Sequence, residues 1–179
     1  FTDEQYVYLD QIEDNDRIIC SGGAGTGKSF LAIQTALREA KKNKSVLVTS
    51  SHEIFVKYLK SEFHEKDLLN ITVLPFNECC TNSFIDKFDL VVVDEAQDIM
   101  NVDDIDCLDG LIKGGLEKGR WRFFLDENAQ AGIIGEFDEY AFDIMKDYSS
   151  TIQKLRQNCR NTSQIVLETE DTTGAYIGK

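Results

Sequence analysis

The segment SGGAGTGKSF (21–30) constrains the fold of this 179-residue chain more than any other. Gly22 is followed, after four residues, by Gly27, Lys28 and Ser29, which is the full spacing of a phosphate-binding loop. Glycines permit positive φ angles, so the backbone can turn its N–H groups around a polyphosphate. Such a loop requires a buried strand before it and a helix after it.

Both flanking segments meet that requirement. Residues 17–20 (RIIC) are a short apolar run typical of a buried strand, and residues 28–42 place apolar side chains at helical spacing. The helix would point the positive end of its dipole at a bound anion. The alternative of a glycine-rich turn with an incidental lysine stays open, but the agreement of both flanks disfavours it.

We therefore expect a nucleotide site at this loop, with ATP and Mg²⁺ as its ligands. Lys28 would bring a positive charge to the β- and γ-phosphates, and Ser29 would offer its hydroxyl to Mg²⁺. The residues expected to hold the nucleotide in this loop are Gly22, Gly23, Ala24, Gly25, Thr26, Gly27, Lys28 and Ser29.

Strand-like and helix-like stretches alternate along the chain. The predicted strands are 17–20, 45–50, 70–76, 88–94, 120–126 and 150–155, and the predicted helices are 28–42, 52–63, 103–113 and one from about 162. This alternation predicts a three-layer α/β/α fold with a mainly parallel central sheet. Ligands of such sheets gather at the carboxyl ends of the strands. We expect the chemistry just after Cys20, Ser50, Val93 and Leu125.

Composition narrows the possible partners. The formal net charge of −13 argues against nucleic-acid binding through a general electrostatic field, although a local basic groove stays possible. No apolar run is long enough for a membrane span or a signal peptide, so we expect an intracellular, cytoplasmic protein without membrane contact. Because the chain begins at Phe1, we expect it to be a fragment of a longer protein.

The cysteines are five in number, an odd count that disfavours a secreted disulfide framework. Their spacing contains no Cys-x-x-Cys pair, and the two histidines are isolated, so we expect no structural metal. We expect small buried apolar residues at all five positions, Cys20, Cys79, Cys80, Cys107 and Cys159.

The segment LVVVDEAQD (90–98) supplies the second half of a nucleotide site. Asp94 ends a buried apolar strand, where its carboxylate can hold Mg²⁺ directly or through water. Glu95 follows it and could orient or deprotonate a water that attacks the γ-phosphate. The alternative is a solvated acidic turn after a strand, which the upstream loop disfavours.

Together, GGAGTGKS and VVVDEAQD resemble motifs I and II of UvrD/Rep-type superfamily 1 helicases, whose second motif is typically Asp-Glu-x-Gln-Asp. Gln97 and Asp98 complete that string. The resemblance implies a RecA-like P-loop NTPase domain that hydrolyses ATP and moves on single-stranded DNA or, as an alternative, on RNA. The segments SGGAGTGKSFLA and NCRNT are most similar to helicase portions attached to nuclease-related (NERD) domains.

The resemblance also assigns roles near the start of the chain. FTDEQ (1–5) is similar to the family's leading segment, which implies that Gln5 contacts adenine; alternatively, Gln5 is a polar residue in the first turn of a helix capped by Thr2. VLVTSSHE (46–53) stands where motif Ia contacts single-stranded DNA, although it departs from the usual Thr-Asn-x-Ala form. The candidate contacts there are Thr49, Ser50 and His52. Alternatively, Ser51 is merely the N-cap of the next helix.

Two later motifs follow in the family's order. FFLDENAQ (123–130) resembles motif III, which implies that Gln130 senses the γ-phosphate. The segment departs from the motif in two ways. The spacing from Asp126 to Gln130 is one residue longer than usual, and the aromatic residue that commonly follows and stacks on a base has no clear equivalent. LRQNCRNTSQI (155–165) resembles motif IV, which implies that Arg160 contacts the γ-phosphate. The alternative is that Arg160 lies exposed on a helix.

The resemblance implies one RecA-like ATP-binding domain over residues 1–166, and we expect 167–179 to be a linker to a second motor domain that the chain lacks. Motifs V and VI are absent, so we expect the chain alone to hydrolyse ATP slowly or not at all. The main alternative is a nucleotide-dependent switch or signalling ATPase, which the net charge favours. A small-molecule kinase would need a basic lid after the core, and none is evident.

Overall fold

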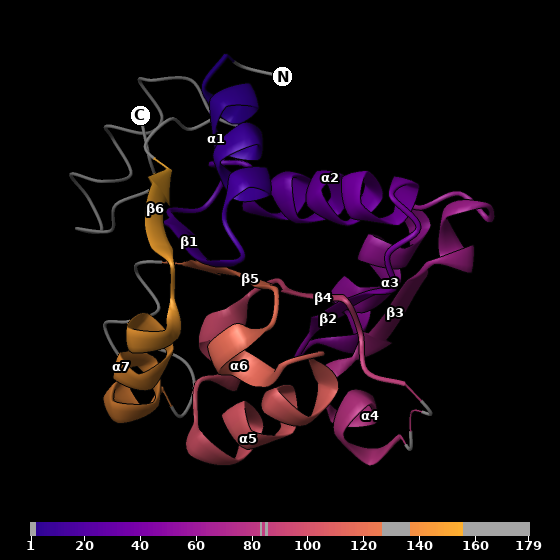
Figure 1. The fold of residues 1–179 in the computed structure, drawn as a ribbon. Helices are drawn as coiled ribbons and strands as arrows, with labels where there is room; N and C mark the ends of the chain where they lie inside the picture. The colour runs from indigo at the N-terminus through magenta and orange to yellow at the C-terminus, as the bar shows by residue number, and fades with distance from the viewer. Residues whose placement is uncertain (1–2, 83, 85, 127–136, 156–179) are drawn as a thin grey trace.

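The central feature of the fold is a six-stranded sheet in the order β3-β2-β4-β5-β1-β6. The computed structural model of the protein describes residues 3–82, 84, 86–126 and 137–155. Within these residues every pair of neighbouring strands is parallel, which confirms the predicted α/β fold (Figure 1). The strands are β1 (Arg17–Gly22), β2 (Val46–Ser50), β3 (Ile71–Pro75), β4 (Leu90–Val93), β5 (Trp121–Asp126) and β6 (Thr151–Leu155).

Helices cover both faces of this sheet. In Figure 1, α1 to α3 lie on one side of the strands and α4 to α7 on the other. None of the described helices is both long and apolar enough to pass through a lipid bilayer. The helices are α1 (Asp3–Asp14), α2 (Lys28–Lys41), α3 (Glu53–Ser61), α4 (Phe76–Thr81), α5 (Val102–Leu111), α6 (Gly115–Lys118) and α7 (Glu139–Tyr148), with 3₁₀ turns η1 (Asp67–Leu69) and η2 (Ala96–Ile99).

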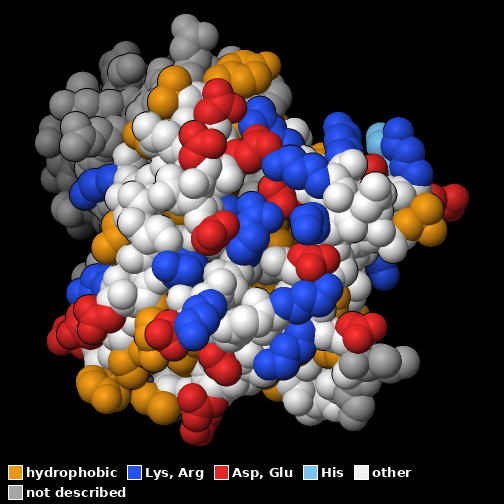
Figure 2. Space-filling model, viewed as in Figure 1, with side chains coloured by type: hydrophobic (Ala, Val, Ile, Leu, Met, Phe, Trp, Pro, Cys, Tyr) orange, Lys and Arg blue, Asp and Glu red, His pale blue; other side chains and the backbone are white. Residues whose placement is uncertain are grey.

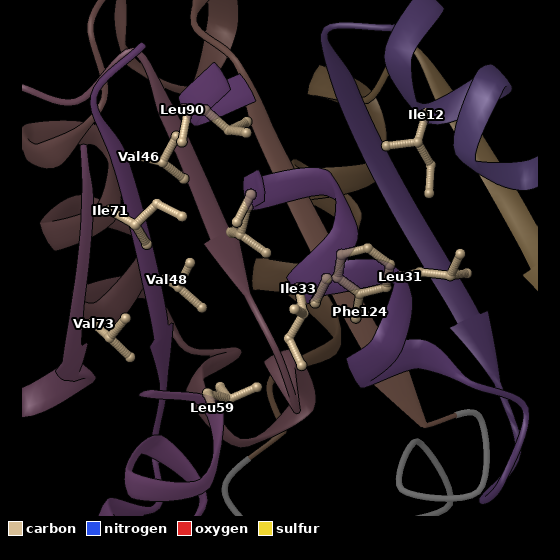
Figure 3. Packing of buried hydrophobic residues seen from close by; sticks show 14 of the residues in the cluster. Ile12, Leu31, Ile33, Val46, Val48, Leu59, Ile71, Val73, Leu90 and Phe124 are labelled. Atoms are coloured by element: carbon tan, nitrogen blue, oxygen red, sulfur yellow. The ribbon is translucent and has the colours of Figure 1, made fainter. Parts of the chain in front are cut away.

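The inner strands β1, β2, β4 and β5 are mostly apolar because both of their faces are buried, whereas the edge strand β6 alternates buried and exposed positions. In β1, Ile18 packs in the cluster on the side of α1 to α3, whereas Ile19 packs in the cluster on the opposite side. Figure 3 shows the first cluster, in which Leu31 and Ile33 of α2 lie among side chains from the strands, such as Phe124 of β5. This packing fixes α2 across the sheet, so the loop before α2 has a defined position.

Ion pairs join α1 to α2 and to the start of β5. Arg38 of α2 contacts Asp10 (3.1 Å) and Glu13 (2.9 Å) of α1. Glu39, only 3% exposed, pairs with Lys42 and with Arg120. Two further pairs belong to the same network, Lys42–Glu13 and Arg120–Asp16. The network orients α1, the helix that carries Gln5, against the helix that follows the Gly22–Ser29 loop.

The predicted strands and helices within the described residues are confirmed to within about two residues at each end. The predicted helix from about 162 lies outside the described residues. Four described helices are absent from the predicted set, although the alternative role for Gln5 anticipated α1. The other three are α4, α6 and α7. Of these three, α4 and α6 are too short to show a periodicity, with six and four residues. The third, α7, carries a recognisable signal, because Asp138 accepts a hydrogen bond from the Tyr140 amide as its N-cap.

The expectation for the cysteines is wrong for one pair. Cys80 of α4 and Cys107 of α5 form a disulfide that links the two helices. Cys20 and Cys79 are buried thiols, as expected, and burial raises their pKa values to about 12 and about 11. Cys159 lies outside the described residues.

We predict that the Cys80–Cys107 disulfide contributes about 3 kcal/mol to stability, because it closes a loop of 27 residues in the unfolded chain. Urea denaturation of the wild type with and without reductant measures this difference. The double variant Cys80→Ser, Cys107→Ser is the control, and it should match the reduced wild type and ignore the reductant. Identical midpoints for oxidised and reduced wild type would show that the bond contributes nothing.

Candidate nucleotide site

The Gly22–Ser29 loop joins the end of β1 to the start of α2, as the sequence predicts. Gly25 (φ 84°) and Gly27 (φ 89°) have left-handed backbone conformations that a β-carbon disfavours. The Thr26 hydroxyl donates to the Gly23 carbonyl at 2.9 Å and closes the turn. The loop therefore curls at the N-terminus of α2, where backbone N–H groups and the helix dipole favour an anion.

Position 22 requires glycine for a different reason, because there is no space there for a β-carbon. A β-carbon at Gly22 would lie 2.7 Å from Thr26 Oγ1 and 2.9 Å from Leu155 Cβ. Both distances are shorter than van der Waals contact, so any larger residue would displace the loop or β6. The first glycine of the motif thus couples the loop to the edge strand of the sheet.

Lys28 holds the buried positive charge of the site. Its side chain is 6% exposed, and Nζ donates to the carbonyls of Gly22 (2.8 Å) and Gly23 (3.1 Å). Nζ also lies 3.6 Å from Asp126 Oδ2 at the end of β5. A cation in this position faces the loop's own backbone, where a polyphosphate would be held.

Asp94 follows β4 and is completely buried. Its Oδ1 accepts a hydrogen bond from the Glu95 amide at 3.0 Å, whereas its Oδ2 has no hydrogen-bond partner within the described part of the chain. Burial raises the pKa of Asp94 to about 7, and the Glu95 charge adds to this effect. Hydrogen bonds from the Ser29 hydroxyl and the Glu95 amide, together with the Lys28 charge, oppose the rise.

A divalent cation fits this carboxylate. The unpartnered Oδ2 of Asp94 and the hydroxyl of Ser29 are both oxygen donors, which Mg²⁺ prefers. In the described ranges, His, Cys, Asp and Glu side chains form no cluster of three or more that would cage a metal. Asp94 and Ser29 would supply one or two ligands, and water and phosphate oxygens others, which is how nucleotide-bound Mg²⁺ is usually held.

Glu95 has a strained backbone, with φ 53° and ψ 45°. This left-handed conformation is uncommon for a residue other than glycine and is often found at functional sites. The Glu95 carboxylate accepts a hydrogen bond from Gln97 Nε2 at 2.7 Å. Gln97 Oε1 in turn accepts from the Asp126 amide at 3.0 Å.

Two residues of this arrangement, Gln97 and Asp126, are not among the predicted site residues. In the sequence Gln97 only completes a motif, but its amide connects Glu95 to the end of β5. Asp126 was noted only for its spacing, but its carboxylate lies beside Lys28. The strand order was the missing information, because it places β5 between β1 and β4.

The residues predicted to contact nucleic acid are only partly accessible. Thr49 and Ser50, at the end of β2, are completely buried, and Cys79 Sγ lies 3.6 Å from Thr49 Oγ1. His52, in contrast, has a side chain that is 68% exposed, and its Nε2 lies 3.1 Å from Asp98 Oδ2.

The alternative role considered for Ser51, as the N-cap of α3, is wrong. His52 occupies the N-cap position, and the Ser51 hydroxyl instead donates to Asp98 Oδ2 at 3.2 Å. The loop after β2 is therefore tied to η2 through Asp98.

Other predicted site residues lie beyond what the structure describes. Gln130 and Arg160 lie outside the described residues, and Gln5 belongs to α1 without a described side chain. Their proposed contacts with adenine and the γ-phosphate stay predictions. The part of the site that the structure brings together comprises the Gly22–Ser29 loop, Asp94, Glu95, Gln97 and Asp126.

The fold and this grouping define a helicase-like P-loop ATPase domain of RecA-like architecture. Residues 16–119, more than half of the chain, match the family model described as Schlafen group 3, DNA/RNA helicase domain. The chain therefore belongs to this family. The matched range includes the Gly22–Ser29 loop, Asp94, Glu95 and Gln97. No curated protein matches the sequence.

Solved structures share the fold at low sequence identity. Pif1 helicase from Candida albicans aligns with a TM-score of 0.61 and 16% identity over 96% of this chain and 43% of its own. Bacteroides Pif1 bound to ssDNA gives 0.55 and 14% over 94% and 45%. The Hef helicase domain of Pyrococcus furiosus gives 0.62 and 13% over 84% and 37%. The chain thus spans less than half the length of each of these structures.

We predict that Asp94→Asn stabilises the metal-free protein by about 4 kcal/mol at pH 8. The pKa of Asp94 rises from 3.8 to about 7 on folding, so between these values the folded state binds more protons than the unfolded state. This carboxyl therefore lowers stability increasingly as the pH rises from about 4 to 7. The gain from Asn should shrink as the pH falls from 8 to 5.

Urea denaturation in EDTA at both pH values measures the effect. Asp106→Asn, which removes an exposed carboxylate from α5, is the control and should change stability little at either pH. An Asp94→Asn variant that is less stable than the wild type at pH 8 would contradict the interpretation.

Proposed function

We propose that this chain is the first ATP-binding motor domain of a superfamily 1, UvrD-like helicase or translocase. In the longer protein, ATP hydrolysis would drive movement on single-stranded nucleic acid. The proposal is supported chiefly by the geometry at the ends of β1, β4 and β5, where Lys28, Asp94 and Glu95 belong to one connected group. The family's DNA/RNA helicase description supports the nucleic-acid track.

Each residue of the group has a chemical task in this proposal. Backbone N–H groups of the Gly22–Ser29 loop and Lys28 Nζ bind the β- and γ-phosphates. Ser29 and Asp94 hold Mg²⁺, which when bound neutralises phosphate charge. Glu95 orients the attacking water and accepts its proton. Because Lys28 and Asp94 are buried, their charges act in a low-dielectric environment, where they are more effective than in water.

The remaining roles depend on parts of the site beyond this group. Gln5 would contact adenine, Gln130 would sense the γ-phosphate, and Arg160 would stabilise negative charge in the transition state. We place residues 1–166 in this domain and 167–179 in a linker to a second RecA-like domain. Closure of the two domains on ATP would complete the site, so the chain alone should turn over ATP slowly or not at all.

His52 is the candidate nucleic-acid contact that the structure leaves accessible. Thr49 and Ser50 would need a rearrangement of the loop after β2 before their side chains could reach a strand. Figure 2 shows Lys and Arg side chains interspersed with Asp and Glu across one face of the molecule. The net charge of −13 is thus not spread as a uniform acidic field on that face, which leaves room for local contacts with phosphates.

A second candidate function is a nucleotide-dependent switch without a nucleic-acid track. The burial of Thr49 and Ser50 and the net charge favour it. Both candidates need the same nucleotide site, so they differ only in their response to nucleic acid.

We predict that ATP turnover by the longer protein is stimulated by single-stranded DNA or RNA and falls at least 100-fold in Lys28→Ala, because the variant loses the buried cation at the phosphates. A phosphate-release assay with and without each nucleic acid measures both effects. Lys41→Ala, which removes an exposed lysine from the same helix, is the matched control and should keep wild-type turnover.

The outcomes separate the candidate functions. Stimulation that disappears in Lys28→Ala supports the motor. Turnover that depends on Lys28 but ignores both nucleic acids supports the switch. Turnover that is unaffected by Lys28→Ala would overturn both. Strong stimulation in this chain alone would contradict the need for a second domain.

A further inference from the structure

The side chain of Gln97 in η2 connects Glu95, the proposed general base, to the end of β5, where Asp126 lies beside Lys28. Gln97 is 7% exposed, and both polar atoms of its amide are engaged. Nε2 donates to Glu95 Oε2 at 2.7 Å, and Oε1 accepts from the Asp126 amide at 3.0 Å. The Asp126 carboxylate lies 3.6 Å from Lys28 Nζ.

The orientation of this amide is fixed by its partners. The Asp126 backbone N–H can only donate, so it must face the oxygen of Gln97. The Gln97 nitrogen must then face Glu95, whose carboxylate can only accept. Exchange of the two amide atoms would place donor against donor and acceptor against acceptor. Gln97 is therefore held in one orientation and presents a donor to Glu95.

This contact has a consequence for the Glu95 carboxylate. Glu95 follows directly after Asp94 in a left-handed backbone conformation, and the hydrogen bond from Gln97 restricts the rotamers that its side chain can adopt. The Gln97 bond engages one carboxylate oxygen, Oε2, and leaves Oε1 as an acceptor for a water proton. Because β5 pairs with β1, the Asp126 amide that binds Gln97 lies at the same carboxyl end of the sheet as the Gly22–Ser29 loop.

We propose that Gln97 is a positioning residue for ATP hydrolysis. Its hydrogen bonds to Glu95 and to the end of β5 keep the Glu95 carboxylate at a fixed position relative to Lys28. This inference rests on the proposed function. Gln97 touches neither phosphate nor metal in this account and acts through Glu95. Its loss should therefore slow turnover without weakening the binding of MgATP.

The test compares Gln97→Met and Gln97→Glu in the longer protein. Gln97→Met keeps approximate length and removes both hydrogen bonds. Gln97→Glu keeps an acceptor for the Asp126 amide but places a carboxylate against Glu95. We expect kcat to fall about 10- to 100-fold in both variants, with KM for ATP and the Kd for a fluorescent ATP analogue in Mg²⁺ within about twofold of wild type.

Two controls distinguish positioning from a general structural effect. Gln153→Met removes another buried glutamine, which bonds to Gln11 on α1, and it should leave kcat unchanged. In a Glu95→Gln background, Gln97→Met should produce no further loss of kcat, because residues that act as a unit are not additive.

Three results would overturn the inference. One is a kcat in both Gln97 variants equal to that of Gln153→Met. Another is a parallel loss of kcat and nucleotide affinity. The third is a further loss of kcat in the Glu95→Gln background. In all three cases the wild type still shows Lys28-dependent ATP turnover. If the proposed function itself is wrong, the wild type lacks this turnover, and the inference about Gln97 is then wrong as well.

Discussion

The position of β5 between β1 and β4 is the constraint on which the candidate site depends. Parallel pairing places Asp126, the last residue of β5, beside Gly22 at the end of β1. On its other side, β5 pairs with β4, the strand that leads to Asp94. The Gly22–Ser29 loop and the segment after β4 are far apart in sequence but meet at the end of β5. There the Asp126 carboxylate lies beside Lys28, and the Asp126 amide donates a hydrogen bond to Gln97.

The site holds more buried charge than a stable fold requires. Lys28 and Asp94 are both buried, and burial outweighs the hydrogen bonds and the Lys28 charge that would keep Asp94 ionised. Taking charged groups out of water costs free energy, which their partners offset only when the geometry is favourable. The buried Lys28 and Asp94 and the strained Glu95 backbone lower stability. Functional sites commonly contain such destabilising features because activity requires them. Mg²⁺ and phosphate would relieve the cost by giving the buried charges partners.

The sequence predicted the fold class and the position of the Gly22–Ser29 loop between β1 and α2 because these depend on local signals. Fixed glycines and apolar runs identify the Gly22–Ser29 loop and the buried strands without knowledge of distant contacts. The role of Gln97 and the Cys80–Cys107 disulfide depend on contacts between segments distant in sequence, which periodicity does not contain. Thr49 and Ser50 sit at the predicted strand end, but their burial follows from packing against α4 and β4.

The most direct test of the account is calorimetric titration of this chain with ATP, with and without Mg²⁺, for the wild type and Lys28→Ala. The account predicts one nucleotide per chain, binding that weakens when EDTA removes Mg²⁺, and at least a tenfold loss of affinity in Lys28→Ala. Equal affinity in the two proteins, or binding indifferent to Mg²⁺, would show that Lys28 and Asp94 do not form the nucleotide site.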